Sequence, residues 1–222
     1  MTDVQKLIAR LARHYGEIAP PPAHGAFELI IWENAGYLLP DDRRAVVFAR
    51  LRNEVGLTPH DILAADPELL LKLAKLGGMN PESRVSRWLE IAQITVDEFN
   101  GNLENVLQLP YAKAKKALKL FPSIGDPGAE KILLLCGIAP GLPLESNGLR
   151  VLLRIGYGRE NLKNYGAQYR SVQEALEGQL PKKANALVQA HLLLRRHGQE
   201  TCHTNVPECG VCPVVDACRF PK

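Results

Sequence analysis

Apolar residues recur along this chain at the three- and four-residue spacing of an amphipathic α-helix. The pattern is plain at residues 4–11 and again at 69–76, and no segment alternates apolar and polar residues as a half-buried strand would. Clusters of proline and glycine, such as Pro20–Pro22 and Gly77–Gly78, interrupt these runs. At typical helix lengths, the pattern predicts an all-α protein of about ten helices.

Composition and charge restrict the functional class only loosely. The chain has 222 residues, 46% of them hydrophobic, which predicts one or two folded domains. Its longest apolar runs, such as 132–136, are far shorter than the roughly 18 residues that cross a bilayer, so we expect no membrane association. The absence of a recognisable secretory signal predicts a location in the reducing cytoplasm. The net charge of +3 is too small to indicate a nucleic-acid partner by itself.

A lysine-rich segment at 111–120 is followed by a turn at 121–128 and a second apolar segment. This order predicts two helices joined by a tight turn, with Asp126 as N-cap and Pro127 in the first position of the second helix. A positive φ at Gly125 would let the backbone amides of the turn converge on a phosphate group. The lysines that would add positive charge nearby are Lys113, Lys115, Lys116 and Lys119. An ordinary αα-hairpin with solvated lysines explains the segment equally well.

Four of the five cysteines lie in the last 21 residues, as Cys202, Cys209, Cys212 and Cys218. Four soft thiolates in a short segment can surround one metal centre, either a tetrahedral zinc ion or a [4Fe–4S] cube with one thiolate at each iron. Zinc sites more often contain two C-x2-C pairs, whereas the spacing here, C-x6-C-x2-C-x5-C, contains one and therefore favours iron–sulfur. The fifth cysteine, Cys136, follows three leucines and is expected to be a buried structural thiol.

With these motifs the sequence resembles the helix-hairpin-helix DNA glycosylases of the endonuclease III type, which hold a [4Fe–4S] cluster with this cysteine spacing. Phe121–Gly125 resembles the Leu-Pro-Gly-Val-Gly hairpin of the family, with Ser123 in place of the first glycine. Residues 26–31 resemble the first barrel helix, and 77–84 resemble the family's Gly-Leu-Tyr-Asn turn. The similarity covers nearly the whole chain.

The resemblance implies two helical domains: a six-helix barrel with the helix-hairpin-helix at 25–139, and a cluster domain made of 1–24 and 140–222. It also implies a [4Fe–4S] cofactor on the four clustered cysteines, a monomeric state, and double-stranded DNA as the partner. By alignment, the residues expected to contact DNA or line the pocket are Lys113, Lys116, Ser123, Ile124, Gly125, Gly128, Tyr37, Leu38 and Asn147. For Leu38, packing in the core is the alternative. Because the chain ends four residues after Cys218, the extra C-terminal domain of the adenine-mismatch enzymes is expected to be absent.

The catalytic positions depart from the pattern of the family. Lyase-type members carry a Schiff-base lysine two residues after the second hairpin glycine, and that position here is Pro127, which has no amine. Lys131 lies one helical turn later, displaced by about 5.4 Å along the axis. The family's aspartate after the hairpin aligns with Glu145, and the acid of the adenine-mismatch glycosylases aligns with Glu33.

These positions indicate a monofunctional glycosylase that removes a damaged or mismatched base by hydrolysis. Glu145 would stabilise the oxocarbenium character at C1′, and Glu33, with a pKa raised by burial beside Trp32, would protonate the leaving base. A solvated or capping role for Glu33 is an equally open interpretation. Two other functions remain: a DNA-binding protein that has lost catalysis, and a bifunctional glycosylase and lyase that uses Lys131.

Overall fold

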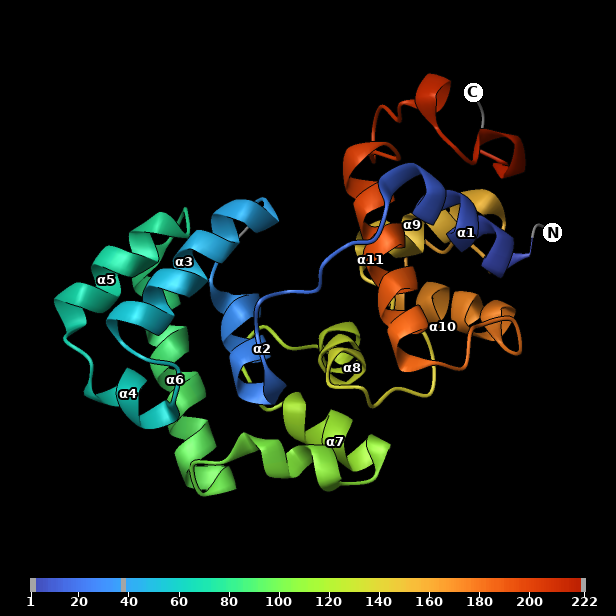
Figure 1. The fold of residues 1–222 in the computed structure, drawn as a ribbon. Helices are drawn as coiled ribbons and strands as arrows, with labels where there is room; N and C mark the ends of the chain where they lie inside the picture. Colours follow the sequence, from blue (N-terminus) through green and yellow to red (C-terminus); the bar gives the residue numbers. More distant parts are fainter. Residues whose placement is uncertain (1–2, 37–38, 221–222) are drawn as a thin grey trace. The chain divides into compact units, whose positions relative to one another are not determined.

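The computed structural model describes residues 3–36 and 39–220, and within those ranges it contains helices and no β-strand. The prediction of an all-α protein is confirmed, with eleven α-helices and three short 3-10 helices in the described ranges against the ten expected. No described helix is long and apolar enough to cross a membrane. The chain divides into two compact units, one of Pro21–Ile138 and one that combines Met1–Pro20 with Ala139–Lys222 (Figure 1). We call them the central unit and the terminal unit.

Helix α2 (Gly25–Asn34) is the core helix of the central unit, and it corresponds to the predicted first barrel helix. It buries side chains on all sides, as a helix that is apolar all round must. Its first turn is fixed from outside, because the Glu104 carboxylate accepts hydrogen bonds from the amides of Ala26 (3.0 Å) and Phe27 (3.2 Å). A carboxylate at this position satisfies free N–H groups and complements the helix dipole.

The other helices of the central unit pack against α2 or against one another. Helix α6 packs against α2, α4 and α5, whereas α8 packs against α2 and α7 (Figure 1). Their bounds are α3 Asp41–Glu54, α4 Pro59–Ala64, α5 Pro67–Leu76, α6 Pro81–Phe99, η1 Leu103–Gln108, α7 Tyr111–Leu118 and α8 Asp126–Leu135.

A buried arginine holds the turn between α5 and α6. The guanidinium of Arg84 is almost completely buried and donates hydrogen bonds to the carbonyls of Ala74 (2.7 Å) and Met79 (3.1 Å). The Ala74 carbonyl also accepts from the amide of Gly77 (2.9 Å), and the Met79 carbonyl lies in the turn outside both helices, so the guanidinium joins the end of α5 to the turn that leads into α6. Because a Cβ on Gly77 would lie 2.7 Å from Arg84 Nε, the turn requires glycine there.

The terminal unit brings the two ends of the chain together. Helix α11 packs against both α9 and α1, and α10 packs against α9. Arg10 on α1 donates to the carboxylate of Asp216 (2.9 Å) and to the carbonyl of Pro213 (2.6 Å), which joins the first helix to the last loop. The bounds are α1 Val4–Tyr15, α9 Ser146–Ile155, α10 Tyr165–Leu176, α11 Ala184–Glu200, η2 Cys209–Val211 and η3 Val215–Ala217.

Candidate functional site

The turn between α7 and α8 differs from the predicted geometry. Gly125 is the N-cap, with φ −91° and ψ −172°, and Asp126 is already the first helical residue. The prediction of Asp126 as N-cap and of a positive φ at Gly125 is therefore wrong. The chain reverses two residues earlier, at Ser123, where φ is +66°. Once the reversal is complete at Ser123, Gly125 needs only the extended conformation of an ordinary N-cap.

Free amides are present at this end of α8. The amide of Ile124 donates to the carbonyl of Phe121 (3.2 Å), and the Ile124 side chain is buried in the core. Within the described residues, the amides of Gly125 and Gly128 have no acceptor. The same holds for the amide of the exposed Ser123, so three of the predicted turn contacts have N–H groups that can reach an anion, while the Ile124 side chain serves packing.

The four lysines of the hairpin fall into two classes. Lys115 pairs with Glu130 (2.8 Å), and Lys119 pairs with Asp126 (2.9 Å). Partial burial opposes the charge on Lys115, but the hydrogen bond and charge of Glu130 raise its pKa on balance. The hydrogen bond from Lys119 lowers the pKa of Asp126.

Lys113 and Lys116, by contrast, are exposed, and neither has a carboxylate within ion-pair distance in the described part of the chain. They are the two lysines that were predicted to contact DNA. Lys115 and Lys119 thus join α7 to α8 through ion pairs, whereas Lys113 and Lys116 are available to bind an anionic ligand.

Glu33 and Lys131 form an ion pair within the central unit. Lys131 Nζ on α8 lies 2.6 Å from Glu33 Oε2 on α2, and the two side chains are only 16% and 18% exposed. Glu33 therefore has a cationic partner in the structure, and its role as the acid stays a prediction. The amine of Lys131 and the carboxyl group of Glu33 are within hydrogen-bond distance, so a proton can pass between them.

Glu145 is held at the start of α9 in the terminal unit. It is the N-cap residue, and its carboxylate accepts hydrogen bonds from the amide of Gly148 (2.7 Å) and the side chain of Asn147 (2.8 Å). These two hydrogen bonds from N–H groups at the start of the helix fix the direction of the carboxylate. This is the state required of a group that stabilises a developing cation.

A chain of hydrogen bonds runs from Glu145 to the C-terminal cysteine loop. Asn147 donates to Glu145 and accepts from Arg150 (2.8 Å), and Arg150 donates to the carbonyl of Cys202 (2.9 Å). One turn later on α9, Arg154 donates to Cys202 Sγ (3.2 Å). The predicted pocket residue Asn147 is thus a link between the carboxylate and the cysteine loop.

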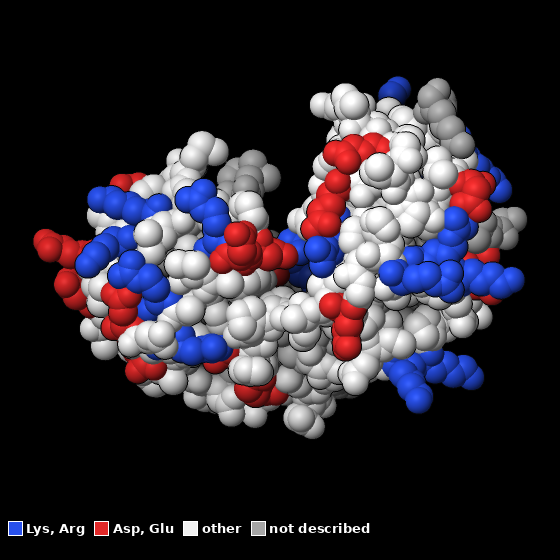
Figure 2. Space-filling view, turned by 45° about the horizontal axis from the view of Figure 1, so that its top comes forward, with Lys and Arg blue, Asp and Glu red and all other residues white. Residues whose placement is uncertain are grey.

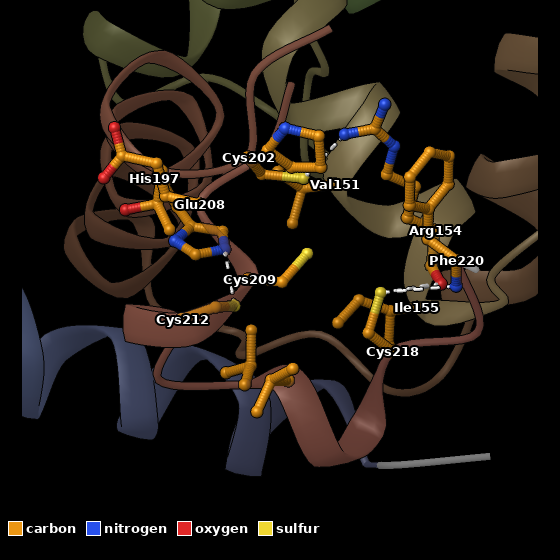
Figure 3. A pocket seen from close by; sticks show the side chains of 14 residues that line it. Val151, Arg154, Ile155, His197, Cys202, Glu208, Cys209, Cys212, Cys218 and Phe220 are labelled. Atoms are coloured by element: carbon orange, nitrogen blue, oxygen red, sulfur yellow. Dashed lines mark hydrogen bonds between the residues drawn. The ribbon is translucent and has the colours of Figure 1, made fainter. Parts of the chain in front are cut away.

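The four clustered cysteines line one pocket, and Figure 3 shows their thiols on its wall around a shared space. No group of three ligating side chains in residues 3–36 and 39–220 is arranged to hold a single metal ion. A mononuclear zinc site brings its ligands together at one atom, whereas a [4Fe–4S] cube places one thiolate at each of four corners. Four cysteine thiols are the donor set that such a cluster requires.

Polar donors surround the thiols of this pocket. Besides Arg154, the amide of Phe220 donates to Cys218 Sγ (3.4 Å), and His197 Nε2 lies 3.6 Å from Cys212 Sγ (Figure 3). N–H groups that face sulfur stabilise negative charge on bound thiolates. Burial lowers the pKa of His197 to about 4, with a smaller contribution from His14.

Sequence reasoning missed Arg150, Arg154 and His197. The signal that could have found the two arginines is their spacing, i and i+4, on one face of an apolar helix that precedes the cysteine segment.

The candidates Tyr37 and Leu38 lie outside the described residues. Cys136 is free and half-buried, and burial raises the pKa of its thiol to about 12, in keeping with the predicted structural role.

Charged side chains do not form a single basic stripe on the face drawn in Figure 2, where basic groups alternate with acidic ones. This agrees with the small net charge of +3. On this face, therefore, no continuous basic surface is presented to an anionic ligand.

No protein-family model matches the chain. Among curated proteins it is similar to Endonuclease III from Sulfolobus acidocaldarius, with 25% identity over 181 residues that span 81% of this chain and 75% of that protein. It is also similar to Endonuclease III from Escherichia coli, with 25% identity over 168 residues, 76% of this chain and 72% of that protein.

Two solved structures share the fold over nearly the whole chain. A non-covalent Endonuclease III–DNA complex superposes with a TM-score of 0.74 at 21% identity, covering 99% of this chain and 96% of that one. A thermostable thymine-DNA glycosylase superposes with a TM-score of 0.75 at 16% identity, covering 97% and 95%. The resemblance predicted from the sequence is confirmed.

Proposed function

We propose that this chain, a member of the helix-hairpin-helix DNA glycosylase superfamily, is a base-excision repair enzyme that hydrolyses the N-glycosidic bond of a damaged or mismatched base in duplex DNA. We further propose that it is monofunctional and leaves an abasic site. The observation that carries the proposal is the fixed carboxylate of Glu145, combined with a proline at the hairpin position where a lyase needs an amine.

In this mechanism the base departs before the nucleophile is bonded. Positive charge develops at C1′ of the deoxyribose, and the ionised Glu145 carboxylate stabilises it. Because Asn147 and the amide of Gly148 already hold both carboxylate oxygens, little reorganisation is needed as the charge appears. A water molecule then attacks C1′, its proton is lost to solvent or to Glu145, and the strand stays intact.

The leaving base takes a proton from the pair formed by Glu33 and Lys131. Lys131 Nζ lies 2.6 Å from Glu33 Oε2, so Glu33 can pass to the leaving base a proton that it receives from Lys131, and the Lys131 amine then regains a proton from solvent. General acids of this kind contribute roughly a hundredfold to ten-thousandfold in rate.

DNA binding would rest on the hairpin. The free amides of Gly125 and Gly128 at the start of α8, together with Lys113 and Lys116, provide a phosphate site that reads no base sequence. Such a site suits a monomeric enzyme that scans double-stranded DNA in the cytoplasm for rare lesions.

Cys202, Cys209, Cys212 and Cys218 would hold the [4Fe–4S] cluster. When bound, a cluster of this kind crosslinks the last segment of the chain and supplies a redox centre. Iron and sulfide analysis, with visible absorbance at about 400 nm, tests the assignment. Stoichiometric zinc in a colourless protein would overturn it.

A panel of lesion-containing duplexes, assayed with and without alkali, tests the main proposal. Strand cleavage that appears only after alkali supports a monofunctional glycosylase. Glu145→Gln should reduce base release by about a hundredfold or more. Asp66→Asn, which alters another N-cap carboxylate on α5, is the matched control and should retain activity. No turnover on any lesion would favour a DNA-binding protein without catalysis.

The ion pair favours one second candidate, a bifunctional glycosylase and lyase. If Glu33 accepts the Lys131 proton, the neutral amine can attack C1′ of an abasic site. Borohydride trapping on abasic DNA separates the candidates: a covalent adduct that Lys131→Gln abolishes would establish the lyase and overturn the monofunctional proposal.

A further inference from the structure

The loop before α10 exposes a large apolar side chain. Leu162 is 89% exposed, the highest value among the large hydrophobic residues in the described ranges. Isolated apolar side chains are common on protein surfaces, so exposure alone indicates nothing. The surroundings of Leu162 make it informative.

Hydrogen bonds brace this loop from within. The side chain of Asn161 accepts from the amides of Lys163 (3.2 Å) and Asn164 (3.1 Å), and Gln168 accepts from the amide of Asn161 (2.9 Å). These contacts form a closed turn around Leu162, so its side chain is presented outward by an ordered backbone.

A second set of bonds fixes the ends of the loop. Ser171 Oγ accepts from the amide of Arg159 (2.9 Å) and donates to the carbonyl of Arg159 (3.2 Å), while Asn164 caps α10 through the amide of Ala167 (2.9 Å). Ordering the loop before binding lowers the entropic cost of inserting its apolar side chain into a partner.

The loop is also basic. Arg159 and Lys163 flank Leu162, and Arg170 lies on the first turns of α10; all three are exposed, with no carboxylate at ion-pair distance in the described part of the chain. Glu160 is the single acidic residue of the loop. Three cations against one anion suit a polyanionic partner better than a neutral apolar one.

Two stacked tyrosines, Tyr165 and Tyr169, lie between the loop and the segment that carries Glu145. Tyr165, at the start of α10, is 47% exposed and stacks on Tyr169, with ring centroids 6.3 Å apart. The hydroxyl of Tyr169 accepts from the amide of Leu144, the residue before Glu145 (3.4 Å). Burial, and to a smaller extent the charge of Glu145, raises the pKa of Tyr165. Tyr165, at the C-terminal end of the loop, therefore lies near the group proposed to act on the deoxyribose.

We propose that the loop Arg159–Tyr165 is a second DNA-contacting element, in which Leu162 inserts between bases next to the extruded nucleotide while Arg159 and Lys163 contact phosphates. The proposal rests on the function proposed above. Proteins that bend or open DNA commonly insert an apolar wedge of this kind beside cationic side chains. Tyr165 offers an aromatic face at the same place, on which a base can stack.

The test compares Leu162→Ala with the wild-type protein on a duplex that contains a stable abasic analogue next to 2-aminopurine. Burial of a leucine side chain is worth about 1.5 to 3 kcal/mol, so Leu162→Ala should weaken binding about tenfold or more and reduce the 2-aminopurine fluorescence that reports unstacking. Val46→Ala, which shortens another exposed aliphatic side chain (55%), is the control and should change neither readout. Because Leu162 is exposed, stability should be unaffected.

Salt dependence gives an independent readout. Lys163→Gln should lower the slope of log affinity against log salt by about one, whereas Leu162→Ala should leave the slope unchanged. Equal affinity, equal slope and equal fluorescence in all variants would overturn the loop proposal. So would a concentration-dependent dimer that Leu162→Ala dissociates, since the leucine would then pack against a second copy.

The failure of this inference is distinguishable from failure of the proposed function. If the wild-type protein excises a base and the loop variants bind like wild type, only the loop assignment is wrong. If the wild-type protein neither excises a base nor prefers the abasic analogue, the glycosylase proposal fails first.

Discussion

Lys131 and Glu33 are 98 positions apart in the chain, yet Lys131 Nζ lies 2.6 Å from Glu33 Oε2 at a partly buried point of the central unit. The contact joins the helix that starts at the hairpin to the most buried helix of that unit. It exists because α8 packs directly on α2. Two residues that the sequence offers as separate candidates, an acid and a displaced lysine, are thus one chemical unit.

The first prediction concerns the pH dependence of that unit. With Lys131→Gln, Glu33 must take its proton from solvent instead of from Lys131. Base release should fall by about a hundredfold at about pH 7.5 and recover as the pH approaches about 5, so the alkaline limb of the pH–rate profile moves to lower pH.

Single-turnover rates across the pH range measure this shift. Lys75→Gln removes an exposed lysine from α5 and should leave the profile unchanged. Undiminished activity of Lys131→Gln at neutral pH would show that Lys131 is not the source of the proton.

The second prediction separates the hairpin lysines. Lys113 and Lys116 are exposed without a carboxylate partner, so each is free to release a counterion on binding a phosphate. The double variant Lys113→Gln with Lys116→Gln should lower the salt slope of duplex binding by about two.

Lys119→Gln is the matched control, because this lysine already pairs with Asp126. It should change the slope by less than one, measured by fluorescence anisotropy at several salt concentrations. A larger change for Lys119→Gln than for the double variant would contradict the assignment.

The third prediction concerns Ser123, which has a positive φ of +66°. A non-glycine residue in the left-handed region costs roughly 1–2 kcal/mol, and a β-branched one costs more. Ser123→Gly should therefore stay within about 1 kcal/mol of wild type, although it loses the hydrogen bond from Arg87. Ser123→Val should destabilise the central unit by more than about 1 kcal/mol.

Urea unfolding followed by tryptophan fluorescence measures both variants. Both tryptophans of the chain, Trp32 and Trp88, lie in the central unit, so the signal reports that unit. Equal stability of Ser123→Gly and Ser123→Val would contradict the backbone strain.

The fourth prediction concerns acid sensitivity at the start of α4. Thr58 and Asp61 form a reciprocal capping box, and the hydrogen bonds from the Thr58 side chain and backbone lower the pKa of Asp61 below its ordinary 3.8. A carboxyl whose pKa is lower in the folded state stabilises the fold above its unfolded pKa, and this contribution is lost as the pH falls through the folded value.

Thr58→Ala should therefore cost about 1 kcal/mol at neutral pH, and the difference from wild type should shrink below about pH 4. The same fluorescence-detected unfolding, repeated at neutral and acidic pH, measures it. A penalty that is independent of pH would show that Asp61 does not contribute through its charge.

The outcome at the hairpin illustrates what a sequence can anticipate. The two helices and the turn between them were predictable, because proline and glycine fix where a helix can begin. The residue with positive φ was not. Glycine at 125 was the natural candidate, but the reversal lies at Ser123, between Phe121 and Ile124, whose side chains are buried in the core.

The sequence by itself determined the helical class, the hairpin with a proline at position 127, and the cysteine segment, because these depend on local spacing and on residue chemistry. Only the tertiary structure decided which charged side chains contact which partners. The contacts are Lys131 with Glu33, Lys119 with Asp126, and Arg150 with the carbonyl of Cys202. Each of these contacts joins different elements of the fold. Pairing over such separations depends on how the helices pack, and helical spacing carries no information about it.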